Sequence, residues 1–205
     1  MATVHIICGK SGSGKDTLVS GLLERCKESF VFDVPYTSRP MREGEVDGVN
    51  YFFRPFPGVY DNHNIVEYRS YIVHNDEWFY WHTKIDESSL AVPDILTIST
   101  ADTIGKYADA YGKENIRVYE LICSPDELLH RLIRREMRQK NPDYIEMIRR
   151  FTADEADWED DDKNPEKVCQ KLGITYYPMN GERMLAANIS RMKELIFPTP
   201  SITLV

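Results

Sequence analysis

Apolar residues along this chain form short runs that alternate with longer stretches where they recur every three to four positions. The short runs predict strands at residues 4–8, 30–34, 95–99, 118–122 and 174–177. Several are apolar on both faces, as in the buried strands of a parallel sheet. The helical spacing predicts helices at residues 16–28, 125–139, 144–158, 165–172 and 182–195. We therefore expect an α/β fold of three layers with a parallel central sheet.

One segment interrupts this alternation. Residues 35–86 are rich in aromatic residues, prolines and turn signals, and their short runs are typical of antiparallel strands. We expect an inserted, mostly-β lobe at 35–86 on a core formed by residues 1–34 and 87–205. We find no internal repeat and no low-complexity tract.

A glycine-rich loop follows the first predicted strand and precedes the first predicted helix. Its spacing, Gly-x-x-x-x-Gly-Lys, is that of a P-loop, which holds the phosphates of a nucleotide. The glycines let successive backbone N–H groups point inward, and the helix directs its positive end at bound phosphates. The residues expected to bind ATP in this loop are Gly9, Ser11, Gly12, Ser13, Gly14, Lys15, Asp16 and Thr17.

Two positions in the loop determine its chemistry. Lys15 is expected to reach the β- and γ-phosphates as a point charge. The next position, normally Ser or Thr, is Asp16. This carboxylate either holds Mg²⁺, directly or through water and with the Thr17 hydroxyl nearby, or only caps the helix.

A second motif, from Tyr36 to Phe53, lies at the start of the lobe. It reads Tyr-Thr-Ser-Arg-Pro-Met-Arg-Glu-Gly-Glu-Val-Asp-Gly-Val-Asn-Tyr-Phe-Phe. Together with the loop, it resembles the monophosphate-binding segment of guanylate kinases. Two arginines around a proline turn can clamp a dianionic phosphate, whereas a lone motif of this kind is usually a surface turn. The resemblance implies that the acceptor phosphate is held by Ser38, Arg39, Arg42 and Tyr51.

The resemblance continues into the later part of the lobe. Glu67, in Ile-Val-Glu-Tyr, is similar to the family glutamate that accepts hydrogen bonds from guanine, whose edge offers two adjacent N–H donors. Tyr80 is similar to a tyrosine on the acceptor phosphate. His82 stands where the family has a small hydroxyl residue, and it either contacts the base or lies at the surface. We expect Trp78 and Phe79 to pack inside the lobe rather than stack on a base.

Other family positions differ in this chain. The usual Leu-Asp-Ile-Asp strand end is Leu96-Thr97-Ile98-Ser99, and the family serine that meets the guanine carbonyl aligns with Pro35. The stretch between the expected base-reading glutamate and acceptor tyrosine is also longer than the common pattern. These changes leave the base and sugar of the acceptor open.

Basic residues on two predicted helices complete the resemblance. Arg131 and Arg135 lie four positions apart on one helix face and are similar to the arginines before the family's lid, and Arg150 is similar to one after it. The resemblance implies a helical lid at residues 136–150 that closes over ATP. We expect Arg134, Arg138 and Arg149 to be solvated. The acidic run at 154–162 is interpreted as a solvated helix end, and the turn at 177–181 as the adenine-side loop.

Composition is typical of a compact enzyme. The chain has 205 residues, 42% of them hydrophobic, and a formal net charge of −8, which argues against nucleic-acid or membrane partners. Its four cysteines are widely spaced and are expected to be reduced. No apolar leader or membrane-length run is present, so we expect a cytoplasmic location, as a monomer or homodimer.

The resemblance as a whole implies a P-loop kinase of nucleotides. Mg-ATP would phosphorylate a nucleoside monophosphate, GMP or dGMP first, with Lys15, Arg39, Arg135 and Arg150 as the catalytic residues and Arg131 also at the ATP. Another (deoxy)nucleoside monophosphate or a sugar phosphate is an alternative acceptor. A non-catalytic protein-binding module on the same fold is the alternative from another class.

Overall fold

The computed structural model describes residues 2–26, 28–42, 44–58, 64–73, 76–90, 92 and 94–197. Its central sheet has five strands in the order β2-β7-β1-β8-β9, and every pair in it is parallel. The strands are β1 (Thr3–Cys8), β2 (Val31–Phe32), β7 (Asp94–Ile98), β8 (Ile116–Ile122) and β9 (Thr175–Asn180). All five expected strands are confirmed, although β9 continues three residues farther than predicted.

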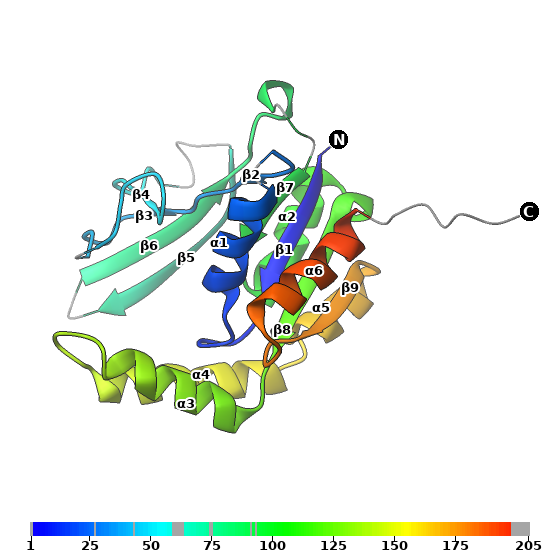
Figure 1. Ribbon diagram of the computed structural model, residues 1–205. Helices are drawn as coiled ribbons and strands as arrows, with labels where there is room; N and C mark the ends of the chain where they lie inside the picture. Colours follow the sequence, from blue (N-terminus) through cyan, green and yellow to red (C-terminus); the bar gives the residue numbers. More distant parts are fainter. Residues whose placement is uncertain are drawn as a thin grey trace, which may run out of the picture.

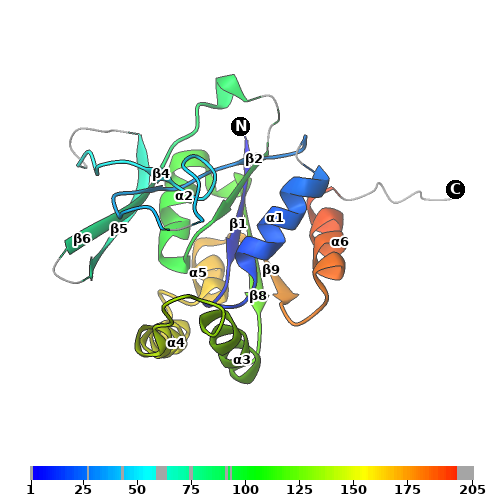
Figure 2. The same ribbon diagram turned by 60° about the vertical axis from the view of Figure 1, so that its left-hand side comes forward.

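Helices cover both faces of this sheet, as Figures 1 and 2 show. The helices α1 (Lys15–Cys26) and α6 (Leu185–Ile196) lie on one face, and α2 (Ile104–Tyr111) and α5 (Pro165–Leu172) on the other. The predicted three-layer α/β architecture is therefore confirmed. Among the described residues, no helix is long and apolar enough to cross a membrane.

Helix α2 was not predicted from the sequence. It has only eight residues, it begins in a 3-10 turn at Ala101–Thr103, and no side chain caps it. Its buried positions, Ile104, Tyr107 and Tyr111, are partly aromatic, so neither a cap nor an aliphatic stripe indicates it in the sequence.

Two apolar cores, one on each face of the sheet, follow from the alternation of side chains along the strands. In β1, Ile6 points to the α2 and α5 side, whereas its neighbour Ile7 points to the α1 and α6 side. Both are fully buried. The strand is thus apolar on both faces because it lies between two helical layers.

The inserted segment forms a second sheet of four strands, in the order β4-β3-β6-β5. These are β3 (Tyr36–Thr37), β4 (Phe52–Phe53), β5 (Ile65–Val73) and β6 (Asp76–Thr83). β6 pairs antiparallel with β3 and β5, as predicted, but β3 and β4 pair in parallel. This difference arises because residues 38–51 return the chain to the start of β3, where Phe52 N donates to Pro35 O.

Aromatic stacking holds this second sheet together. Phe56 lies flat on Phe79 at 4.2 Å between ring centroids, and Tyr36 stacks on Trp81 at 5.3 Å. Trp81 is buried. Because Phe79 stacks on Phe56, it packs within the lobe, as predicted.

Two helices form a hairpin beside the phosphate loop. α3 (Pro125–Glu136) begins at Ser124, whose hydroxyl accepts from Glu127 N as a helix cap, and α4 (Tyr144–Glu159) runs back beside α3 (Figure 1). The buried Glu136 carboxylate accepts hydrogen bonds from Gln139 Nε2 and Asp143 N, which shapes the turn between them. The segment expected as a lid is thus the turn and the start of α4.

The contact between α1 and the sheet tests this description of the core. Leu22 is fully buried in the core on the α1 and α6 side, so Leu22→Ala should lower the free energy of unfolding by about 2–5 kcal/mol. Denaturant unfolding followed by circular dichroism measures this. Ser20→Ala, at an exposed position of the same helix, should change stability by less than about 0.5 kcal/mol. Equal effects of the two substitutions would contradict the assigned packing of α1.

Candidate functional site

The phosphate loop occupies residues 9–14, between the end of β1 and the start of α1. Gly12 and Gly14 have φ of +85° and +100°, which L side chains rarely adopt, so the backbone path depends on glycine there. The Lys15 ammonium folds back over the loop and donates to Gly9 O at 2.6 Å and Lys10 O at 3.1 Å. The sequence motif thus forms the strand–loop–helix arrangement expected of it.

Charged groups of both signs act on the Lys15 ammonium. Burial lowers its pKa from the ordinary value, while the carboxylates of Asp16 and Asp154 oppose that change. The charge of Arg135, on α3, adds to the lowering, so this arginine lies within electrostatic range of the loop. A phosphate placed on the loop would favour the charged ammonium.

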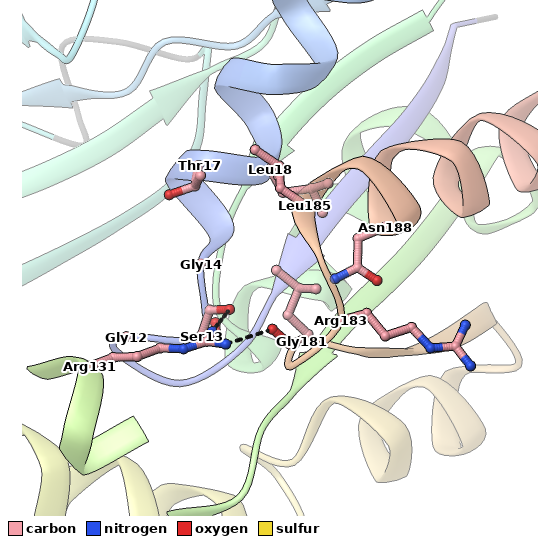
Figure 3. A pocket seen from close by; sticks show the side chains of 11 residues that line it. Gly12, Ser13, Gly14, Thr17, Leu18, Arg131, Gly181, Arg183, Leu185 and Asn188 are labelled. Carbon is pink, nitrogen blue, oxygen red and sulfur yellow. Dashed lines mark hydrogen bonds between the residues drawn. The ribbon is translucent and has the colours of Figure 1, made fainter. Parts of the chain in front are cut away.

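A cavity of about 320 Å³ opens next to the loop (Figure 3). Gly12, Ser13, Gly14 and Thr17 line one side, and residues from α3 and from the segment after β9 line the other. Gly181, from the expected adenine-side turn, lines it, and Arg183 and Asn188 line it without having been predicted from the sequence. The expected adenine-side turn at 177–181 is wrong in its limits, because β9 continues through Asn180 and the turn starts at Gly181.

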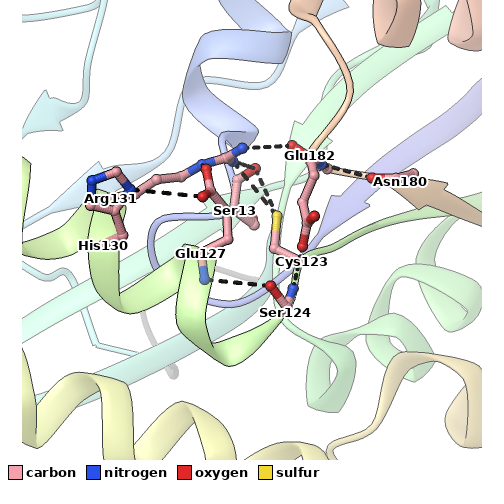
Figure 4. A network of polar contacts seen from close by, with 9 residues as sticks. Ser13, Cys123, Ser124, Glu127, His130, Arg131, Asn180 and Glu182 are labelled. Atoms are coloured by element: carbon pink, nitrogen blue, oxygen red, sulfur yellow. Dashed lines mark hydrogen bonds and ion pairs between the residues drawn. The ribbon is translucent and has the colours of Figure 1, made fainter.

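Arg131 connects the walls of this cavity, as Figure 4 shows. Its guanidinium donates to Ser13 O at 3.2 Å and to Gly181 O at 3.1 Å, and its Nε donates to Glu127 Oε1 at 2.6 Å. It thus ties the loop to the segment after β9. A planar guanidinium in this position offers a face on which a nucleotide base can stack.

Helix α4 places two acidic residues on the phosphate loop. Ser11 N donates to Asp154 Oδ2 at 2.5 Å, and Lys10 Nζ pairs with Glu155 Oε2 at 2.7 Å. The interpretation of this run as a solvated helix end is therefore wrong for these two residues. It holds for the exposed Asp162, which pairs with Lys171 at 2.8 Å. The contact between Ser11 and Asp154 joins residues 143 positions apart, so no local pattern indicates it.

A second cationic site lies in the inserted lobe around Arg39. This side chain is buried, and both its terminal nitrogens bond the Glu45 carboxylate, at 2.5 and 2.7 Å. Its guanidinium lies 5.0 Å from the Tyr51 ring centroid, and the Tyr51 and Tyr80 rings are 5.9 Å apart. The structure thus brings Arg39, Tyr51 and Tyr80 together.

Two other residues expected at this second site are arranged differently. The Arg42 side chain is exposed, and its backbone N donates to Glu45 Oε2 at 2.7 Å. Ser38 Oγ accepts from Phe79 N at 2.9 Å, so this hydroxyl oxygen links β3 to β6. Glu43, between the two motif halves, lies outside the described residues.

Charges at the start of α1 influence the Tyr51 hydroxyl of the Arg39 site. Burial raises the pKa of the Tyr51 hydroxyl, with Tyr80 adding to the rise and Arg39 opposing it. The Asp16 carboxylate, at the start of α1, raises it further. A phosphate-loop residue is therefore within electrostatic range of the second cationic site.

A buried polar cluster lies between the lobe and the core. Glu67 and His82 are 1% and 2% exposed, which makes the surface alternative for His82 wrong. His82 Nδ1 is 2.8 Å from Asp33 Oδ2, and its Nε2 is 3.8 Å from Glu67 Oε1. Of the positions that differ from the family pattern, Thr97 is fully buried, and the Ser99 hydroxyl bonds that of Thr103 at 2.7 Å.

Arg135 and Arg150, expected to act from the lid, lie beside glutamates of the α3–α4 hairpin instead. Arg150 and Arg149 both pair with Glu146, each at 2.7 Å. These partners, Arg149 first, lower the pKa of Glu146 to about 2, although partial burial opposes the shift. Arg135 is half exposed and 3.8 Å from Glu136. Arg134, Arg138 and Arg149 are exposed as predicted, and Arg149 also pairs with Glu146 at the surface.

The first turn of α1 offers oxygen donors for a divalent cation. Asp16 and Thr17 are exposed there, directly after Lys15. Among the described residues, no group of three or more His, Cys, Asp or Glu side chains is arranged to hold a metal. Mg²⁺ commonly takes one or two protein oxygens and completes its shell with phosphate and water, so these two residues fit it.

The fold and the loop define a P-loop α/β protein with an inserted β lobe. The guanylate kinase family model matches residues 1–76. A curated guanylate kinase from Helicobacter hepaticus is 33% identical over 144 residues, which is 65% of this chain and 66% of that protein, just under two thirds. In both comparisons, this chain is similar to guanylate kinases.

The fold agrees with this family. The crystal structure of guanylate kinase from Anaplasma phagocytophilum matches with a TM-score of 0.59 at 17% identity, over 95% of this chain and 85% of that one. The likeness supports the fold alone, because the identity is low.

The contact between Asp154 and the loop predicts competition with phosphate. Asp154→Asn keeps an oxygen that can accept from Ser11 N but removes the negative charge, so pyrophosphate should bind about tenfold more tightly. Calorimetry in the presence of a metal chelator measures this affinity. Asp157→Asn, whose carboxylate pairs with Lys163, is the matched control and should change nothing. Weaker binding by Asp154→Asn would contradict the prediction.

Proposed function

We propose that this protein transfers the γ-phosphoryl group of ATP directly to a nucleoside monophosphate, GMP or dGMP, and releases ADP and the diphosphate. The observation that supports the proposal is the presence of two cationic sites, one around Lys15 and one around Arg39. Electrostatic contact between Asp16 and Tyr51 supports their closeness. Two phosphate sites that face each other suit transfer between two bound nucleotides.

On the donor side, the loop N–H groups and Lys15 would hold the β- and γ-phosphates. The base of ATP would lie in the cavity beside Arg131 and Gly181. Asp16 and Thr17 would hold Mg²⁺, which when bound neutralises phosphate charge. Lys15 remains close to the transferred group and stabilises the charge on its oxygens.

On the acceptor side, Arg39 would bind the monophosphate bidentately, and the Tyr51 and Tyr80 hydroxyls would donate to it. Arg42 and Ser38 would complete this site from the same turn. For Arg39 to do so, its bond to Glu45 must yield at least in part to the phosphate. Glu67 and His82 would contact the base.

Closure of the α3–α4 hairpin would bring further positive charge to the transferred group. Arg135 is already within electrostatic range of Lys15. Arg150 would have to leave Glu146 to join it. Closure also excludes water, which limits hydrolysis of ATP. In this proposal, residues 35–86 are the acceptor-binding lobe, and residues 1–34 and 87–205 are the core.

An intact phosphate loop favours an enzyme over a protein-binding module. Lys15 and the loop glycines are all present, and they form a strand–loop–helix of the expected geometry. A module without catalysis has no need of a half-buried ammonium at this position.

Removal of Lys15 tests the proposed reaction. Wild-type protein with Mg-ATP should form a diphosphate from GMP or dGMP, and Lys15→Ala should lower kcat by at least about a hundredfold. Chromatographic detection of both products measures this. Lys193→Ala, at an exposed position of α6, is the matched control and should keep full activity. Undiminished turnover by a folded Lys15→Ala variant would overturn the proposal.

Arg39→Lys tests the acceptor site. The substitution keeps one charge but loses the bidentate geometry, so KM for the monophosphate should rise about ten- to a hundredfold. KM for ATP should stay unchanged. Arg54→Lys, at a half-exposed arginine paired with Asp47 at 3.0 Å in the same lobe, is the control. An equal rise of both KM values in Arg39→Lys would place this arginine outside the acceptor site.

A further inference from the structure

His82 is held in one orientation by a buried carboxylate. Its Nδ1 lies 2.8 Å from Asp33 Oδ2, and both side chains are almost fully buried. Asp33 follows β2 in the core, whereas His82 lies on β6 in the lobe. The Tyr107 hydroxyl donates to the same Asp33 oxygen at 3.4 Å, and the His82 and Tyr107 rings meet edge to face. The second ring nitrogen, Nε2, is therefore directed away from Asp33.

The carboxylate beside Nε2 has no hydrogen-bond partner among the described residues. Glu67 Oε1 and Oε2 are both buried and unbonded, with His82 Nε2 at 3.8 Å from Oε1 and Arg69 Nε at 3.5 Å from Oε2. These separations are too long for hydrogen bonds. A buried carboxylate that accepts no hydrogen bond is costly even with cationic groups nearby, so the site is suited to a ligand that donates to it.

The surroundings of His82 favour its charged form. Burial works against the imidazolium, but Asp33, through its charge and its hydrogen bond, outweighs this together with Glu67 and raises the pKa of His82. Arg69, on β5, opposes the rise. Tyr107 on α2 is the other titratable group at this ring, and burial keeps its hydroxyl protonated by raising its pKa.

We propose that the Asp33–His82 pair determines base selectivity, with Nε2–H of the imidazolium donating to a ring carbonyl oxygen of the acceptor while Glu67 accepts from the adjacent ring N–H. This inference rests on the proposed function. His82 is the residue that contacts the base, and Asp33 is a positioning residue that keeps it charged. Neither the role of Asp33 nor the charge of His82 follows from the sequence motifs.

The arrangement selects a class of base. The donor Nε2–H of His82 beside the acceptor Glu67 matches a base edge with C=O next to N–H, as in guanine and hypoxanthine. Adenine does not match, because it presents a ring nitrogen acceptor beside an amino donor. The second free oxygen of Glu67 can accept from the guanine amino group. The order of preference is therefore GMP, then IMP, then AMP.

Deprotonation reverses the role of Nε2. Neutral His82 keeps its proton on Nδ1, toward Asp33, so Nε2 becomes an acceptor and no longer suits a carbonyl oxygen. The pKa of His82 is raised in the folded protein. Selectivity for GMP is therefore fully present at pH values below the ordinary pKa range of histidine. It is lost as the pH rises through the raised value.

The experiment compares GMP with AMP over pH. The ratio of their kcat/KM values, and of their binding affinities measured by calorimetry, is followed from about pH 6 to 8.5. In wild-type protein, both ratios should fall with rising pH. In Asp33→Asn, which can still accept from Nδ1 but carries no charge, the fall should shift to lower pH, and the ratio near neutral pH should drop about tenfold or more. A pH-independent wild-type ratio, or an unshifted profile in Asp33→Asn, overturns the inference.

Further variants separate this role from a structural one. His82→Gln has no titrating group at this position. Its ratio of kcat/KM for GMP to that for AMP should therefore stay constant from about pH 6 to 8.5. Asp47→Asn, the same substitution on the lobe surface, should reproduce the wild-type profile. KM for ATP should be unaltered in all variants. Absence of diphosphate with every monophosphate would contradict the proposed function, and the binding ratios would still decide this inference.

Discussion

The Lys15 ammonium, from the start of α1, is held beside the end of β1, and this position constrains the elements around it. It is held over the loop by the carbonyl oxygens of Gly9 and Lys10, and two positive-φ glycines allow the backbone to curve beneath it. The loop takes this shape because it connects a strand buried on both faces to the N-terminus of α1. The α3–α4 hairpin lies beside this loop and contributes the carboxylates of Asp154 and Glu155 to it.

Carboxylates hold many of the groups that would meet phosphate. Glu45 bonds Arg39, Asp154 bonds Ser11 N, and Glu146 bonds Arg150. A chain of net charge −8 can thus keep local cationic sites, because a carboxylate is paired with each of these groups. In the proposed function, phosphate would replace a carboxylate at each of these groups. The Asp33–His82 pair extends the same principle to the base.

Much of the fold follows from local patterns in the sequence. Strand and helix periodicities indicated the five core strands, and the loop motif indicated a phosphate site, because both depend on residues close together in the chain. The parallel pairing of β3 with β4 did not follow, since a two-residue strand carries no signal for the direction of its partner. Helix α2 was not predicted either, because it is short and has no capping side chain to indicate its start.

The candidate site could be predicted only in part. The motifs indicated Arg39, Tyr51 and Tyr80, and these lie together. The contact of Asp154 with Ser11 spans 143 positions, and Asp33 meets His82 only because the lobe folds against the core. Polar partners across such separations depend on tertiary packing, which a single sequence does not display.

The most direct test of the two facing phosphate sites is the affinity of a linked nucleotide, in which adenosine and guanosine are joined through a chain of phosphates that can span both sites. If the sites face each other, the second half binds at a high effective concentration, so this molecule should bind at least about a hundredfold more tightly than ATP or GMP alone, and each should compete with it. Binding no tighter than that of the better single nucleotide would contradict the account.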